Sequence, residues 1–248
     1  MKILGIIPAR YASTRFPGKP LVNIAGKSML QRVYEQVKKC DSLHEVIVAT
    51  DDKRIFDHVI EFGGVAAMTS DQHQSGTDRC AEVAAKYPEY DVIINIQGDE
   101  PFIAPEQIAL VAGCFNEPGT QLATLIKKIN TTEELYNFSS PKVIINKQWE
   151  AIYFSRAAIP HVRGEEPQRW LYHTTYYKHI GIYGYNSAVL QQITLLPLSS
   201  LEKAESLEQL RWIENGYRIK VAETELETYA IDTPQDLEKL IENLKLKQ

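Results

Sequence analysis

Three cationic side chains lie close together near the amino terminus, in the stretch IPARYASTRFPGKPL at residues 7–21. Arg10, Arg15 and Lys19 follow an apolar run, and Gly18 allows close approach of the backbone to a ligand. Residues 1–34 contain six Lys or Arg and no Asp or Glu, although the whole chain has a net charge of -5. Clustered cations and exposed amides favour binding of a polyphosphate. A solvated turn whose cations only face water is the alternative.

The segment AGKS at residues 25–28 has the ending of a phosphate-binding P-loop. That motif requires a glycine five positions before its second glycine, and Leu21 stands there instead. No predicted strand directly precedes the segment either. We therefore discard the P-loop interpretation.

Two aspartates are candidate ligands for a divalent cation. Asp99 lies in NIQGDEP, after an apolar run, and Asp232 lies in AIDTPQDL, where we expect a strand to end before a helix. Magnesium prefers one or two carboxylates together with substrate phosphates. The sequence therefore predicts Mg²⁺ at Asp99, whereas spacing alone does not decide between a metal ligand and a helix cap for Asp232. The alternative role of Asp99 is a helix cap or a salt-bridge partner, and that of Asp232 is a helix cap.

The composition is that of a globular protein, with 248 residues, 44% of them hydrophobic and 24% charged. The negative net charge argues against a nucleic-acid partner. The three cysteines are isolated, which supports neither a disulfide framework nor a zinc site. The amino-terminal run ILGII is too short for a signal peptide or a membrane span, so we expect a cytoplasmic protein without membrane insertion.

Apolar strand-like runs alternate with helix-like segments over the first hundred residues. KILGIIPA, EVIVATD, VAAMTS and DVIINIQGDEP read as strands, and SMLQRVYEQVKKC, KRIFDHVIEFGG and TDRCAEVAAKY read as helices. This alternation predicts an α/β fold with a mostly parallel sheet covered by helices on both faces. Ligands bind at the carboxyl ends of such strands, which places residues 8–19, Asp51 and the QGDEP loop at one edge.

The pattern changes from about residue 121. LATLIKKI, KVIINK, AIYFSR and HIGIYGY read as strands with little helix between them, and indicate antiparallel additions. SLEKAESLEQLRWIENG reads as one helix, and ETYAIDTPQDLEKLIENLK as strand, turn and helix. We expect a single domain over residues 1–248 with a β-rich excursion at about 121–187.

The chain resembles the 3-deoxy-manno-octulosonate (Kdo) cytidylyltransferases, or CMP-Kdo synthetases, over its whole length. The motif IPARYASTRFPGKPL alone indicates the broader sugar nucleotidyltransferases, whereas HQSGTDR and HIGIYGY are more specific for this family. Five further segments also match: VATDD, QGDEP, YFSRAAIP, LEKAESLEQLR and IDTPQDLE. The resemblance implies a Rossmann-like nucleotidyltransferase fold and a homodimer, with the β-rich excursion serving the acceptor and dimerisation. It also implies Mg²⁺-dependent transfer of CMP from CTP to Kdo, with release of pyrophosphate, for lipopolysaccharide synthesis.

The resemblance also implies residue roles. The triphosphate would be held by Arg10, Arg15 and Lys19, with Lys19, Arg10 and Asp99 catalytic and Asp99 and Asp232 on the metal. The cytidine side would involve Ser75, Gly76 and Arg79. The sugar would be bound by a larger set: Gln97, Arg156, His179, Tyr183, Glu208 and Gln209.

Three alternatives stay open. Residues 161–178 match the family least well and lie between two sugar-side segments, which leaves a modified octulosonate as acceptor. An enzyme for another acidic sugar, such as a sialic acid, would share the loop and metal site but differ at Arg156, His179 and Gln209. A regulatory protein that binds CTP without turnover would keep the basic loop but lack a paired metal site.

Overall fold

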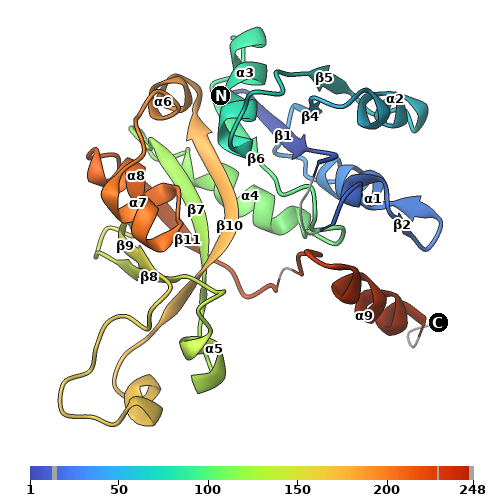
Figure 1. Cartoon of the computed structure of the whole chain (residues 1–248). Coiled ribbons are helices and arrows are strands. Elements are labelled where there is room, and N and C mark those ends of the chain that lie inside the picture. Colours follow the sequence, from blue (N-terminus) through green and yellow to red (C-terminus); the bar gives the residue numbers. More distant parts are fainter. Residues whose placement is uncertain (13–15, 228, 246–248) are drawn as a thin grey trace. The chain divides into compact units, whose positions relative to one another are not determined.

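The chain divides into two compact units in its computed structural model, which describes residues 1–12, 16–227 and 229–245 (Figure 1). Unit 1 comprises Met1–Ala109 and Glu227–Gln248, and unit 2 comprises Leu110–Leu226. Helix α4 (Pro105–Cys114) contains the boundary between them. The β-rich excursion predicted at about 121–187 lies within unit 2.

Unit 1 contains a parallel sheet in the order β6-β1-β4-β5. The strands are β1 (Ile3–Ala9), β4 (Glu45–Thr50), β5 (Ala66–Met68) and β6 (Val92–Asn95). Consecutive residues of β1, such as Ile6 and Ile7, are both fully buried, as are Val48 and Ala49 of β4. Burial of both strand faces requires a cover on each side. The predicted alternation of strands and helices is confirmed.

Helices pack on both faces of this sheet. They are α1 (Met29–Val37), α2 (Lys53–Glu61) and α3 (Gly76–Lys86). Helix α9 (Pro234–Lys245) instead packs through Leu237 and Leu240 on Ile24 and Met29. The chain moves from β1 through β4 to β5 and then returns to β6, so right-handed crossovers put α1 and α2 on one face and α3 on the other (Figure 1). The prediction from amphipathic periodicity, that these segments form helices covering both faces of the sheet, is therefore confirmed.

The first loop ends in a short 3₁₀ helix, η1 (Lys19–Leu21), followed by the hairpin β2 (Asn23–Ile24) and β3 (Lys27–Ser28). Ala25 and Gly26 form the hairpin turn with φ of 48° and 89°. Ser28 caps α1 by accepting a hydrogen bond from the Gln31 N–H. The AGKS segment is thus a hairpin turn and a helix cap. This agrees with the sequence analysis, which discarded the P-loop interpretation.

Unit 2 is mixed in strand direction. The strands are β7 (Leu122–Lys128), β8 (Lys142–Ile145), β9 (Ala151–Ser155), β10 (Tyr177–Asn186) and β11 (Ile219–Glu223). The pairs β10–β7, β10–β8 and β8–β9 are antiparallel, whereas β11 pairs with β7 in parallel. The helical segments are α5 (Thr132–Tyr136), η2 (Pro167–Tyr172), α6 (Ser187–Ile193), α7 (Ser200–Glu205) and α8 (Gln209–Glu214). The predicted antiparallel additions are confirmed.

Two element predictions are wrong. The segment predicted as one helix at 200–216 is divided into α7 and α8, because Ser206 adopts a left-handed conformation with φ of 52°. The predicted strand in ETYAID is not formed in its described residues, and the last strand is β11, earlier in the chain. Burial of Ile231 and one backbone hydrogen bond hold this extended segment without a strand ladder.

Within the described residues, none of the helices combines the length and the apolar character that crossing a membrane requires.

Candidate active site

The carboxyl edge of the unit 1 sheet is packed so tightly that Gly98 has no room for a side chain and Gly76 has little. A Cβ atom on Gly98 would lie 2.9 Å from the Pro8 carbonyl oxygen, and one on Gly76 would lie 3.3 Å from Pro8 Cγ. The end of β1, the QGDEP loop and the start of α3 therefore meet at this edge. Asp51 follows the end of β4 beside them. The structure confirms the expectation that these segments share one edge.

Lys19, Asp99 and Asp232 come together in unit 1 although they are distant in sequence. Lys19 Nζ lies 2.7 Å from Asp99 Oδ2 and 3.3 Å from Asp232 Oδ1. The side chains of Lys19, Asp99 and Asp232 are 14%, 23% and 42% exposed, so the cluster is shielded but reachable. The Ile231 N–H donates to the Asp99 carbonyl oxygen at 3.0 Å, which ties the carboxyl-terminal segment to the QGDEP loop.

Asp236 fixes the turn that presents Asp232. Its Oδ2 atom accepts hydrogen bonds from the Asp232 N–H at 3.2 Å, the Thr233 N–H at 2.9 Å and the Thr233 hydroxyl at 2.8 Å. The Thr233 hydroxyl in turn accepts from the Asp236 N–H, which completes a capping box at the start of α9. These hydrogen bonds, the Thr233 hydroxyl first, lower the pKa of the Asp236 carboxyl.

Two neighbouring carboxylates fit magnesium better than a metal that needs a full set of protein ligands. Among the described residues, no group of three or more His, Cys, Asp or Glu is arranged to hold a metal ion. Magnesium commonly keeps several waters and takes phosphate oxygens, so two aspartates suffice. Glu100 is buried beside Asp99; burial first, and the Asp99 charge second, raise its pKa to about 7. It therefore adds only part of a negative charge near neutral pH.

Of the two arginines of the first loop, the structure describes Arg10 but not Arg15. Arg10 follows directly after β1 and is partly exposed. Arg15 lies outside the described residues. The loop closes through a hydrogen bond from the Gly18 N–H to the Tyr11 carbonyl oxygen at 2.9 Å, and Gly18 has the left-handed φ of 72° that glycine favours.

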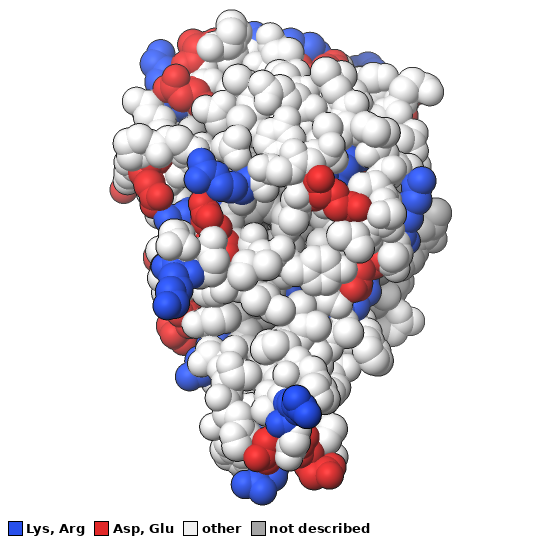
Figure 2. Space-filling view, turned by 90° about the vertical axis from the view of Figure 1, so that its left-hand side faces the viewer, with Lys and Arg blue, Asp and Glu red and all other residues white. Residues whose placement is uncertain are grey.

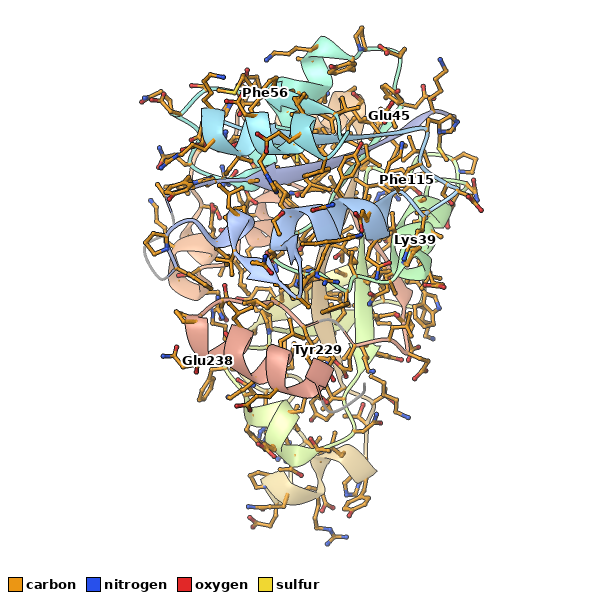
Figure 3. All side chains as sticks on the ribbon, turned by 90° about the vertical axis from the view of Figure 1, so that its right-hand side faces the viewer. Lys39, Glu45, Phe56, Phe115, Tyr229 and Glu238 are labelled. Atoms are coloured by element: carbon orange, nitrogen blue, oxygen red, sulfur yellow. The ribbon has the colours of Figure 1, made fainter. Side chains whose placement is uncertain are left out.

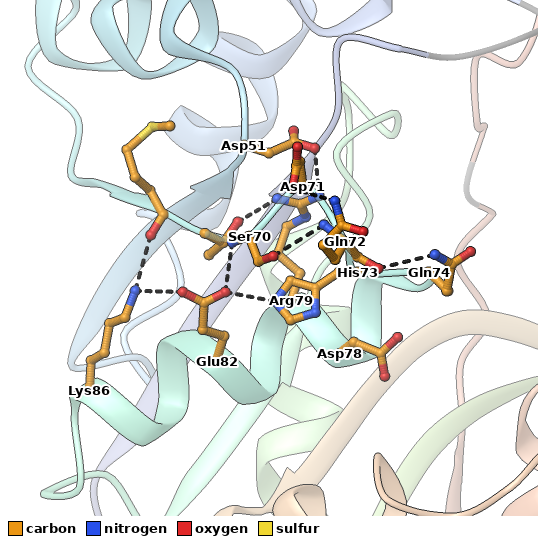
Figure 4. Close-up of polar contacts among 12 residues, drawn as sticks. Asp51, Ser70, Asp71, Gln72, His73, Gln74, Asp78, Arg79, Glu82 and Lys86 are labelled. Atoms are coloured by element: carbon orange, nitrogen blue, oxygen red, sulfur yellow. Dashed lines mark hydrogen bonds and ion pairs between the residues drawn. The ribbon is translucent and has the colours of Figure 1, made fainter.

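The predicted cytidine-side residues lie at the end of the loop between β5 and α3 and in the first turns of α3 (Figure 4). Ser75 caps α3 in a capping box with Asp78, and Gly76 is the first helical residue. Arg79 is fully buried, donates to Thr69 Oγ1, and lies 3.1 Å from Asp51 Oδ2. These contacts make Arg79 a support that joins the ends of β4 and β5. Its nucleotide contact stays a prediction.

Glu82 of α3 holds the same loop from its other side (Figure 4). Its carboxylate accepts from the Ser70 N–H at 2.8 Å and lies 2.7 Å from both His73 Nε2 and Lys86 Nζ. Partial burial alone would raise the pKa of Glu82, but these partners outweigh it and lower the pKa to about 2. Glu82 is therefore ionised at neutral pH and fixes the loop.

His179 lies in unit 2 on β10, just before the bulge between Ile180 and Tyr183; it pairs with Ile126 of β7, and its ring contacts the Thr124 hydroxyl. The Thr124 hydroxyl donates to the Ile182 carbonyl oxygen at 2.7 Å, so it accepts from His179 Nε2 at 3.0 Å. The His179 ring packs on Phe154 and Tyr183 at centroid distances of 5.3 and 5.2 Å. Burial lowers the pKa of His179 to about 3. The ring is neutral, and its Nδ1 atom is an acceptor.

Arg156 lies directly after β9 and is held by the break between α7 and α8. Its guanidinium donates to the carbonyl oxygens of Glu205, Phe138 and Ser206 at 2.7, 3.1 and 3.2 Å. A guanidinium has five N–H donors. These three bonds fix its plane and leave two donors, a number that suits bidentate binding of a carboxylate.

The other predicted sugar-side residues occur in both units. In unit 2, Tyr183 is buried with its ring edge-on to Trp212 at 5.1 Å, and burial raises its pKa well above the usual range. Gln209 is buried, and its Nε2 atom has no hydrogen-bond partner among the described residues. Glu208 lies 3.6 Å from the Arg211 guanidinium. Gln97 belongs to unit 1, in the QGDEP loop.

Four supporting residues were missed by the sequence reasoning. Asp236 has a sequence signal, since the spacing of Thr233 and Asp236 is that of a capping box. Glu82 has a local i,i+4 pair with Lys86, but its loop partners Ser70 and His73, like the partners of Thr124 and Glu205, lie further away in the sequence. The Glu205 carboxylate, for example, accepts from Ser155 Oγ at 2.7 Å.

Comparisons with known proteins give a consistent result over the whole chain. A family model described as cytidylyltransferase matches residues 4–221. A 3-deoxy-manno-octulosonate cytidylyltransferase of Parabacteroides distasonis is 60% identical over 97% of both chains, and one of Bacteroides thetaiotaomicron is 57% identical over 99% of both. The solved structure of CMP:2-keto-3-deoxy-manno-octonic acid synthetase complexed with CTP is 43% identical, with a TM-score of 0.92 and coverage of 100% of both chains. The resemblance and the fold class predicted from the sequence are confirmed.

Proposed function

The chain belongs to the cytidylyltransferase family, and we propose that it transfers CMP from CTP to Kdo and releases pyrophosphate. The observation that carries this proposal is the Lys19, Asp99 and Asp232 cluster at the carboxyl edge of the unit 1 sheet, in a chain 60% identical to a named Kdo cytidylyltransferase. The CTP in the related solved structure supports CTP as the nucleotide.

The reaction needs charge neutralisation and positioning rather than a covalent intermediate. The anomeric hydroxyl of the sugar attacks the α-phosphorus of CTP, and the bond to the β-phosphate oxygen breaks. Arg10, Arg15 and Lys19 neutralise charge on the phosphates. Arg156 binds the sugar carboxylate, and neutral His179 accepts a hydrogen bond from a sugar hydroxyl. No side chain acts as a nucleophile.

We further propose that Asp99 and Asp232 hold Mg²⁺ when the nucleotide is bound. The ion would neutralise phosphate charge and increase the acidity of the attacking hydroxyl. The two partly exposed carboxylates held by one ammonium support this assignment.

A homodimer, a cytoplasmic location and a role in lipopolysaccharide synthesis belong to the same proposal. The exposed apolar side chains of unit 2 include Leu195 at 84% and Leu198 at 60%, three residues apart in the chain, and burial of such side chains on association would be favourable. Figure 2 shows wide uncharged areas between scattered charges of both signs on one face. CTP is a cytoplasmic metabolite, which supports the location. Light scattering coupled to size exclusion is expected to give twice the mass of the 28.2 kDa chain.

Pyrophosphate release with CTP, Mg²⁺ and a panel of acidic sugars tests the proposed reaction. We expect release with Kdo and much slower release with sialic acid. Faster release with sialic acid or with a modified octulosonate would assign a different acceptor. Binding of CTP without release with any sugar would favour a regulatory protein.

A further inference from the structure

One ammonium group lies between the two aspartates assigned to the metal. Both Asp99 Oδ2 and Asp232 Oδ1 are within 3.3 Å of Lys19 Nζ, so the two carboxylate oxygens are close neighbours. Their negative charges would repel each other without a cation nearby. Lys19 therefore provides, in the chain without nucleotide, a positive charge in contact with both carboxylates.

The position of Lys19 limits what else these carboxylates can bind. Its backbone is fixed at the start of η1, after Gly18, whereas its Nζ atom is at the end of a flexible four-carbon stem. A divalent cation that binds between the same two oxygens would take the position of the ammonium and be repelled by its positive charge, so the ammonium has to move away. A nucleotide triphosphate offers the displaced ammonium a new anionic partner.

We propose that Lys19 and the divalent cation occupy the two aspartates in turn. The ammonium holds the site in the free chain, and it transfers to the phosphates when nucleotide and metal bind together. This exchange rests on the proposed function, because it assumes the metal site. It makes metal binding weak in the free chain and couples it to CTP, and coupling of this kind is reciprocal.

Manganese binding to the chain without nucleotide tests the exchange directly. Free Mn²⁺ is measured by electron paramagnetic resonance for the wild type and for Lys19→Met. We expect Lys19→Met to bind Mn²⁺ at least tenfold more tightly, because the competing ammonium is gone. Lys19→Gln, which is also neutral, should show the same gain and replaces Lys19→Met if that variant does not fold. Lys27→Met is the matched control, since Lys27 pairs with Glu35 elsewhere in unit 1, and it should bind as the wild type does.

The Asp99→Asn variant separates the failure of the exchange from the failure of the metal site. The gain must disappear in the double variant Lys19→Met/Asp99→Asn. If folded neutral Lys19 variants bind Mn²⁺ no more tightly than the wild type, while Asp99→Asn weakens Mn²⁺ binding with CTP present, the exchange is wrong and the proposed metal site stands. If Asp99→Asn leaves Mn²⁺ binding unchanged with and without CTP, the metal site itself is wrong, and the exchange fails with it.

Discussion

Asp236→Ala is expected to increase the Mg²⁺ requirement of the reaction without abolishing it. The Asp236 Oδ2 atom accepts three hydrogen bonds from the turn that presents Asp232. A hydrogen bond to a charged group contributes about 1.5–3 kcal/mol, and each ~1.4 kcal/mol is a factor of ten in affinity. Loss of one such contribution from the metal-bound state predicts metal binding roughly 10- to 100-fold weaker, the usual effect of losing a residue that orients a ligand.

The assay is the Mg²⁺ concentration that gives half-maximal pyrophosphate release at saturating CTP and Kdo. Glu238→Ala is the control, because Glu238 is exposed on the same helix α9 (Figure 3). We expect Asp236→Ala to need 10- to 100-fold more Mg²⁺ than Glu238→Ala, and to approach the wild-type kcat when Mg²⁺ saturates. Equal Mg²⁺ requirements of the two variants would refute the positioning role of Asp236.

Three further outcomes are expected in other parts of the site. Arg156→Lys should raise the KM for Kdo roughly 10- to 100-fold with little change in the KM for CTP, since an ammonium does not reproduce the planar fork; an unchanged KM for Kdo would assign the carboxylate to another cation. Because the pKa of His179 is about 3 when folded and about 6.5 when unfolded, the unfolded state binds more protons between these values, and the free energy of unfolding falls as the pH decreases from 6.5. His179→Gln should therefore flatten urea-measured stability between pH 7 and pH 4.5, by up to about 2.7 kcal/mol; parallel pH profiles would contradict a buried neutral ring. Glu82→Ala should raise the KM for CTP but not for Kdo, because Glu82 holds the loop at Ser70 and His73, and equal changes in both constants would indicate only general destabilisation.

The parallel part of the fold could be predicted because its signals are local. Each strand of unit 1 is an apolar run, and each helix shows amphipathic periodicity, so the carboxyl edge and the position of Asp99 followed from the chain alone. The role of Asp232 came only from the family resemblance. Its local pattern suggested a strand end, whereas the structure holds it in an extended segment bound to the Asp99 backbone.

The sugar-side geometry could not be predicted because it depends on contacts between distant segments. The break between α7 and α8 arises where Arg156 binds the carbonyl oxygens of Glu205 and Ser206, about fifty residues later in the chain. The neutral state of His179 results from burial among side chains of distant segments, such as Phe154, and its ring contacts Thr124 in another strand. Neither feature leaves a periodic pattern in the sequence.

Pyrophosphate release from CTP and Kdo by Asp99→Asn tests the central claim most directly. Glu35→Gln, which removes a partly exposed carboxylate paired with Lys27, is the matched control. We predict that the wild type and Glu35→Gln turn over at similar rates. Asp99→Asn should lose at least 100-fold in rate, about 2.7 kcal/mol, with an unchanged thermal midpoint. Near-wild-type turnover of Asp99→Asn at saturating Mg²⁺ would contradict the account.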